Sequence, residues 1–306
     1  MVTTLSPASE TFLANMERVQ QQVADASAQV SSGRKVNVAS DAPDEIDAIL
    51  QLRANIAHNS QIKSNLALAT ADANAADSAL TSATKLMDRA VTLGSQGATF
   101  TLDATGRQSI AAEVQSLQDQ MLAISRTVVQ GRYIFSGDAG GSPAYAADPA
   151  APNGVDRLLT SPATQRVEDP SGGSFAVGQT AQNIFDSRNA DDSFATGNVF
   201  AALNSLQVAL QNNDTAGITT AVGMLKQASD HLNTAQAFYG SVENRLTDAS
   251  NFADQYDVQL QAELSQKQDA DVASAAMLLN QGNIQLQAAF QMQAKMPHTS
   301  LFDFLG

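Results

Sequence analysis

Both ends of this chain carry apolar positions in alternating steps of four and three residues, which places them on a single stripe of a helix. The N-terminal stripe is formed by Phe12, Met16, Val19, Val23, Ala26 and Val30. The C-terminal stripe is formed by Val242, Leu246, Ala249, Ala253, Tyr256 and Leu260. Residues 301–306 are also mostly apolar, although chain ends are usually polar. This pattern favours a protein that buries its ends against a partner, and so an assembly component over a catalyst.

Helix start and stop signals divide the N-terminal half. The first helix is expected over about 7–31, with Gly33 as its C-cap. Asp41 is a candidate N-cap for a second helix, because its side chain could accept from free amides of the first turn. The apolar rhythm of that helix runs over 62–90, and Gly94 with Gly97 is expected to end it.

A third helix should follow the second in an antiparallel hairpin, because only a short glycine-containing loop separates the two. Thr105 and Gln108 form a T-x-x-Q pattern, which predicts a capping box at its start. Its apolar stripe is expected to run from Ile110 to Val128.

The composition changes between Ala139 and Asn198, which hold five of the eight prolines and seven of the eighteen glycines. Such density breaks helices, and apolar–polar stretches such as 174–177 predict a small insert containing β-structure. The helical rhythm resumes over 199–232 around a turn near 212–217, and the last long helix is expected to begin near Ala235. A change of phase at 266–271 predicts a break before a terminal helix.

These patterns predict a mainly α fold: an elongated antiparallel helical or coiled-coil rod built from both termini, with a small β-containing central insert. Residues 1–40 with 266–306 are expected to form a terminal-helix inner domain. Residues 41–138 with 199–265 are expected to form a rod domain, and residues 139–198 an outer insert.

Composition excludes several classes of function. The formal net charge is −14, which argues against nucleic acid and anionic membranes as partners. The chain has no cysteine, which excludes disulfides and thiolate chemistry. No cleavable signal peptide is expected, since the first basic residue is Arg18 and no apolar region precedes it. No apolar run approaches the roughly 20 residues of a membrane-spanning helix.

Catalytic and metal-binding patterns are not found. His58, His231 and His298 are too far apart in sequence to form a helical metal pair. Asp191–Asp192 is interpreted as a solvated loop, and Gly172–Gly173 as a turn. There is no G-x-S-x-G, phosphate-binding loop or dinucleotide fingerprint. We therefore expect no catalytic, cofactor-binding or metal-binding residues.

Three stretches resemble the flagellin superfamily. Residues 30–41 resemble its SSG-x-x-(I/V)-N-x-x-x-D signature, residues 131–137 resemble the GRY-(L/I)-F-(S/G)-G element typical of the hook-associated protein 3 family, and residues 284–305 resemble the C-terminus of that family. The last two favour this family of hook–filament junction proteins over flagellins. The signature positions are Ser31, Ser32, Gly33, Asn37, Asp41, Gly131, Arg132, Tyr133, Phe135 and Gly137.

The resemblance implies a structural protein of the bacterial flagellum, located outside the cell after type III export without a cleaved signal. It implies self-association in a ring that connects the first hook-associated protein to flagellin, and an export chaperone as an earlier partner. The expected assembly interface comprises Leu5, Phe12, Met16, Val19, Val23, Leu279, Ile284, Leu286, Phe290, Leu301, Phe302, Phe304 and Leu305.

Three alternatives stay open. A filament-forming flagellin is the first, and it is distinguished by the element at 131–137, by the Leu-Phe-Asp-Phe-Leu end at 301–305 and by location along the flagellum. A cytosolic coiled-coil scaffold would explain the apolar stripes but not the insert, the phase change or the apolar end. An enzyme with its chemistry in the insert would need a catalytic pattern, and residues 139–198 contain neither cysteine nor histidine.

Overall fold

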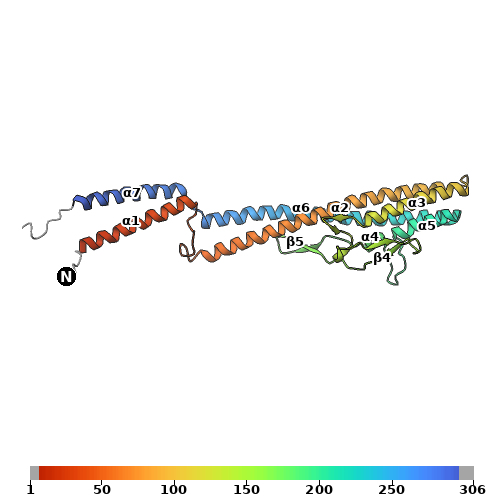
Figure 1. Cartoon of the computed structure of the whole chain (residues 1–306), viewed down its shortest axis with the longest axis horizontal. Coiled ribbons are helices and arrows are strands. Elements are labelled where there is room, and N and C mark those ends of the chain that lie inside the picture. Colours follow the sequence, from red (N-terminus) through yellow and green to blue (C-terminus); the bar gives the residue numbers. More distant parts are fainter. Residues whose placement is uncertain (1–6, 296–306) are drawn as a thin grey trace, which may run out of the picture. The chain divides into compact units, whose positions relative to one another are not determined.

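The computed structural model describes residues 7–295 and is mainly helical (Figure 1). The helices are α1 (Pro7–Ser32), α2 (Ile46–Gly97), α3 (Ala104–Ser125), α4 (Ala181–Phe185), α5 (Val199–Gln211), α6 (Thr215–Gln268) and α7 (Val272–Lys295). The short strands are β1 (Val128–Val129), β2 (Arg132–Tyr133), β3 (Tyr145–Ala147), β4 (Val155–Arg157), β5 (Arg166–Glu168) and β6 (Ser174–Ala176), with a 3-10 turn η1 at Gly137–Ala139. The predicted mainly α class with a small β-containing insert is confirmed.

The chain forms two compact units. The first contains the described parts of 1–58 and 257–306, and the second contains 59–256. The finer division into inner, rod and outer domains stays a prediction.

The second unit has a continuous apolar core formed by α2, α3, α5 and α6 together with the insert. The predicted stripe of α2 lies in this core: Leu66, Ala73, Leu80, Met87 and Ala90 are all buried. The many alanines let neighbouring helices approach closely, which long side chains would prevent. Gly94 extends this approach, because a Cβ there would lie 2.6 Å from Val222 Cγ2.

Hydrogen bonds between α2 and α6 fix their antiparallel register. Asn59 Nδ2 donates to the carbonyl oxygen of Ala253 at 2.9 Å, and Gln236 Nε2 donates to Asp77 Oδ1 at 3.1 Å. Residue numbers therefore rise along α2 while they fall along the neighbouring stretch of α6. The partner stripe on α6 is buried at Val242, Leu246, Ala249 and Ala253.

The strands form three separate two-stranded antiparallel hairpins, β1–β2, β3–β4 and β5–β6. In the first hairpin, Gln130 and Gly131 have φ angles of 49° and 80°. Two successive residues with positive φ form the tight turn that matches the natural twist of a hairpin, and Gly131 adopts this conformation without strain.

Aromatic rings anchor the insert to the helices. The ring of Phe135 meets that of Phe185 edge-to-face, with centroids 5.6 Å apart, and that of Tyr239 with centroids 6.4 Å apart.

A buried carboxylate, Asp186, accepts hydrogen bonds from Tyr145, Asn153, Asn198 and Arg188. A buried charge is tolerated when such donors replace its lost hydration.

Four details of the sequence-based predictions were wrong. Helix α3 begins after Asp103, whose Oδ1 accepts from Gly106 N, so Thr105 and Gln108 lie inside the helix and form no capping box. Val128 is not on the stripe of α3, because the helix ends at Ser125 and Val128 is half-exposed in β1.

Helix α6 begins at Thr215 and not near Ala235. No proline lies between these two residues, so nothing interrupts the helix there. Asp41 does not cap the second helix, which begins at Ile46. Its carboxylate instead accepts hydrogen bonds from the backbone amides of residues 37 and 38.

Candidate assembly surfaces

The terminal helices α1 and α7 pack against each other in the first unit. Gly282 of α7 faces α1, where an added Cβ would collide with Val23 Cγ2. Six residues expected at the assembly interface are half-buried along these two helices, namely Phe12, Met16, Val19, Val23, Leu279 and Leu286. The structure therefore gives these stripes partial cover within their own chain.

Helix α7 has further apolar side chains that this pairing leaves exposed. Ile284 and Phe290, both expected at the interface, are 66% and 53% exposed, and Met277 is 67% exposed. Met277 and Ile284 are seven residues apart, so they lie on one face. That face is opposite the stripe of Ala275, Leu279, Gly282 and Leu286 that meets α1.

The sequence of α7 has no charged residue between Val272 and Ala294. A helix exposed to water on one side usually carries charges there. An uncharged helix with apolar side chains on two faces is typical of a helix that a second partner covers. The remaining expected interface residues, Leu5, Leu301, Phe302, Phe304 and Leu305, lie outside the described residues.

The first signature builds the connection between α1 and α2. Gly33 ends α1 with φ +69°, and its amide donates to Gln29 O at 2.8 Å. Ser31 Oγ and Ser32 Oγ both donate to Ala28 O, at 3.0 and 2.7 Å, and Ser32 Oγ accepts from Arg34 N. Both hydroxyls therefore bind one carbonyl in the last turn of α1, and Ser32 also holds the residue that follows Gly33.

Asn37 and Asp41 fold the rest of this connection. Asn37 Nδ2 donates to Arg34 O at 3.2 Å. Asp41 Oδ2 accepts from the amides of Asn37 and Val38 at 2.8 and 2.9 Å. These two backbone hydrogen bonds lower the pKa of Asp41 below its ordinary value, because they stabilise the carboxylate.

The same connection pairs with the turn between α6 and α7. Lys35 N donates to Gln268 O at 2.8 Å, and Ala270 N donates to Gly33 O at 2.9 Å. These bonds tie the end of α1 to the start of α7. The signature thus positions the two terminal helices as a pair.

The second signature forms the β1–β2 turn and the strand that follows. Arg132 Nη2 lies 2.7 Å from Asp72 Oδ2 on α2, so the turn is fixed to the helix beneath it. Tyr133 is half-buried and Phe135 fully buried. Gly137 has φ +60°, and a Cβ there would collide with Pro162 O. Gly131 and Gly137 are therefore required by backbone geometry.

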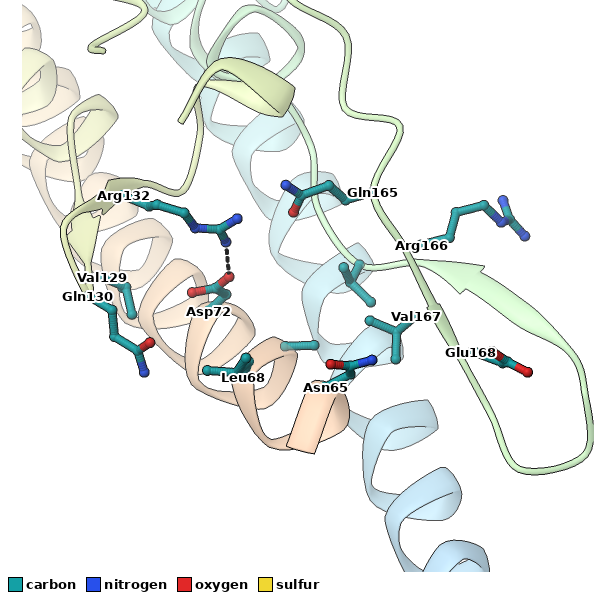
Figure 2. A pocket seen from close by; sticks show the side chains of 12 residues that line it. Asn65, Leu68, Asp72, Val129, Gln130, Arg132, Gln165, Arg166, Val167 and Glu168 are labelled. Carbon is teal, nitrogen blue, oxygen red and sulfur yellow. Dashed lines mark hydrogen bonds and ion pairs between the residues drawn. The ribbon is translucent and has the colours of Figure 1, made fainter. Parts of the chain in front are cut away.

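A cleft of about 590 Å³ opens beside this element (Figure 2). Its walls are α2, the β1–β2 turn and β5. Leu68 and Val167 lie along it, and the Arg132–Asp72 pair spans its upper end in Figure 2. The cleft is in the size range that accepts a large side chain or small ligand.

The polar residues singled out in the sequence lie in surface loops and helix contacts. Asp192 pairs with Arg157 and Arg188 in a surface loop, and these guanidinium groups contribute to a lowered pKa of its carboxyl. His231 Nε2 lies 2.7 Å from Asn183 O. His298 lies outside the described residues. Across residues 7–295, no cluster of ligands suited to a metal ion and no helix able to cross a bilayer is found.

Sequence reasoning missed two features of the second unit. One is the buried network around Asp186, whose donors come from four separate segments. The other is Phe252, a half-exposed aromatic residue on α6. The first has no local sequence signal, whereas the second could have been found as an aromatic residue off the buried stripe.

Both ends of the chain match known protein families. The family model for the bacterial flagellin N-terminal helical region matches residues 2–139, and the model for the bacterial flagellin C-terminal helical region matches residues 222–305. Together they span most of the chain.

Two relatives that match this chain over most of its length have similar sequence identity to it. Flagellar hook-associated protein 3 of Escherichia coli strain K12 is 26% identical over 291 residues, covering 90% of both chains. Flagellin of Bacillus subtilis strain 168 is 27% identical over 271 residues, covering 87% of this chain and 86% of the flagellin.

Among solved structures, flagellar hook-associated protein-3 of Legionella pneumophila matches with a TM-score of 0.60 at 14% identity. The match covers 71% of this chain and 98% of that one. At this identity the likeness supports the fold.

Proposed function

This chain belongs to the bacterial flagellin family, and we propose that it is a structural component of the bacterial flagellum located at the hook–filament junction. Proteins of this family are structural, so the chain is not an enzyme. In the proposed role it is an adaptor that joins the first hook-associated protein on the hook side to flagellin on the filament side. Its copies form a ring in the helical wall between them.

The observation that carries the assembly role is the second apolar face of α7. Ile284 and Met277 remain mostly exposed after α1 and α7 have paired, on a helix without charge from Val272 to Ala294. Covering one such side chain contributes about 1.5–3 kcal/mol, which is available only when a neighbour arrives. Assembly would thus stabilise the terminal helices and their contacts together.

The element at 131–137 supports the junction location over the filament. It resembles the hook-associated protein 3 family at each of its seven positions, and its residues have specific structural roles here. Gly131 and Gly137 have positive φ, Arg132 binds Asp72, and Phe135 fills the core.

A filament-forming flagellin is the second candidate. The sequence identity to the Bacillus subtilis flagellin is 27%, and that to the hook-associated protein is 26%. Labelling isolated flagella with an antibody against this protein, followed by electron microscopy, distinguishes the two. A band at the hook–filament boundary supports the junction adaptor. Label along the whole filament would make the chain a flagellin.

The proposed role requires export of the chain from the cell. The chain would pass through the flagellar type III apparatus without cleavage, with a chaperone covering the C-terminal helix beforehand. The uncharged face of α7 is a suitable surface for such a chaperone, since it would otherwise favour premature association. Detecting the intact chain in secreted material would support export and exclude a cytosolic scaffold, whereas retention in the cell would contradict it.

A further inference from the structure

An exposed aromatic side chain and an open cleft lie on two sides of the second unit. Phe252 on α6 is 47% exposed, and its ring stacks on Tyr256 with centroids 6.3 Å apart and planes 13° apart. The cleft of Figure 2 lies over α2. The β5–β6 hairpin separates them: β5 lines the cleft, while the turn after β5 and Phe175 line a second hollow with Phe252.

We propose that Phe252 of one copy of this chain inserts into the cleft between α2 and β5 of the neighbouring copy in the ring. The occupant is therefore a second copy of this chain. The inference rests on the proposed ring but specifies how its subunits contact each other.

The chemistry of the cleft suits a phenyl ring. Leu68 provides exposed apolar surface, and the largely buried Ala69 and Val167 line the cleft beside it. Leu68 is 48% exposed, which leaves its side chain available for contact. The guanidinium of Arg132 at the upper end could lie against the face of the ring, a favourable cation–π arrangement.

Phe252 is also suited to be the inserted group. It lies on the exposed side of the long helix α6, and the Tyr256 ring already restricts its orientation. Little rotamer freedom is therefore lost on docking. Rigid aromatic side chains that fill a pocket are typical of residues that dominate protein–protein binding.

Charges of both signs border the two surfaces, and one acidic and one basic side chain among them would pair across the proposed contact. Asp248 lies one helical turn before Phe252 on the same exposed face, and no salt bridge to it is found in the described part of the chain. At the cleft, Arg166 donates to Ser174 but contacts no carboxylate among residues 7–295. Docking would bring this carboxylate near this guanidinium.

The relative level of the two surfaces agrees with a ring. Because Asn59 is bonded to Ala253, Phe252 lies level with the residues beside Asn59. Leu68 is then about 12 Å further along α2, given a rise of 1.5 Å per residue. Two different surfaces generate a heterologous contact, and an offset of about 12 Å between them displaces each copy along the axis, as in one turn of a helical wall.

Cysteine cross-linking tests the contact, since the natural chain has no cysteine. Asn251→Cys and Asn65→Cys place thiols beside the aromatic residue and the cleft while leaving Phe252 intact. Flagella from cells that produce both variants are treated with a short bifunctional thiol reagent. We expect a mixed dimer joined between positions 251 and 65, and no dimer from either variant alone.

Four further substitutions show whether the named side chains carry the contact. In the Asn251→Cys chain, Phe252→Ala should lower the mixed-dimer yield at least tenfold, whereas Val208→Ala, at a half-exposed residue outside both surfaces, should not change it. Asp248→Arg should lower the yield, and adding Arg166→Asp should restore it. Circular dichroism verifies that each variant folds.

Absence of the mixed dimer, or a yield that Phe252→Ala leaves unchanged, would overturn the inference. Antibody labelling of the same flagella reports the location of the chain independently. A junction band without the cross-link would therefore leave the proposed function intact while rejecting this contact.

Discussion

The guanidinium of Arg107 donates from Nε to the carbonyl oxygen of Gly97 at 2.8 Å, so a side chain of α3 closes the C-terminal end of α2. Arg107 is only 5% exposed, and it also donates to Thr99 O and to Asn213 Oδ1. One buried cation thereby joins three segments: the end of α2, the loop after it and the turn before α6. The partial negative charge at the end of α2 favours it there.

We expect Arg107→Ala to lower the free energy of unfolding by about 2–4 kcal/mol, because it leaves buried acceptors without a donor. Urea denaturation followed by circular dichroism measures this. Arg89→Ala is the matched control, since Arg89 forms an exposed pair with Glu113 and should cost less than about 1 kcal/mol. Equal effects of the two substitutions would contradict the assigned role of Arg107.

Gly137→Ala should destabilise the second unit by about 1–3 kcal/mol, since φ at this residue is +60° and the new methyl group would meet Pro162 O. Gly141→Ala provides the control: its Cβ would lie in open space, and the effect should stay within about 0.5 kcal/mol. Thermal melting of both variants beside the natural chain is the measurement. A melting temperature unchanged by Gly137→Ala would show that the backbone adapts.

Gly282→Ala should separate α1 from α7, because the added methyl group would collide with Val23 Cγ2. Hydrogen exchange of the α7 amides should become faster. Adding Val23→Ala removes the collision and should restore slow exchange, which distinguishes a steric effect from a loss of helix propensity. Gly240→Ala, in the middle of α6 with space around it, should instead stabilise its helix by about 0.5–1 kcal/mol.

Acid should open the connection that Asp41 holds. Its pKa in the folded chain is lowered by the amides of Val38 and Asn37, so its stabilising effect is present above the unfolded pKa of about 3.9 and is lost as pH falls through the folded value. Hydrogen exchange should show weaker protection of these two amides in acid, after correction for intrinsic rates. Asp41→Asn should weaken it already at neutral pH; full protection in that variant would argue against the carboxylate's role.

Alkali should unfold the second unit through its buried tyrosines. Burial raises the pKa of Tyr239 to about 12 and raises that of Tyr145 as well. Above about pH 10 the unfolded chain releases these protons while the folded chain retains them, so stability falls as pH rises from about 10 to 12. Denaturation at stepped pH should show this fall. Tyr239→Phe should flatten it, and an unchanged slope would exclude Tyr239 as a source.

The helices of this protein were largely predictable because their signals are local. The apolar stripe of α2 repeats without interruption from Ile62 to Ala90, and the structure buries that stripe. The break between α6 and α7 followed from a change of phase, and the C-cap at Gly33 from residue type alone. The start of α3 was misplaced because Asp103 and Thr105 offer competing caps only two residues apart.

The polar contacts were not predictable, because their partners are far apart in sequence. Asp41 was assigned to the helix that follows it, whereas its carboxylate binds the amides that precede it. Arg132 binds Asp72 from 60 residues away. Residue type and spacing identify an Asp or an Arg that needs a partner, but they do not identify the partner.

The sequence by itself determined the helical class, the central insert and the apolar stripes, because each depends on residues within a few turns of one another. Only the tertiary structure decided which stripes are covered and which remain exposed. Val23 and Leu279 are partly covered by the pairing of α1 with α7, whereas Ile284 on the same helix is not. Burial depends on which elements meet in space, and the free energy of that choice is spread over contacts between segments distant in the chain.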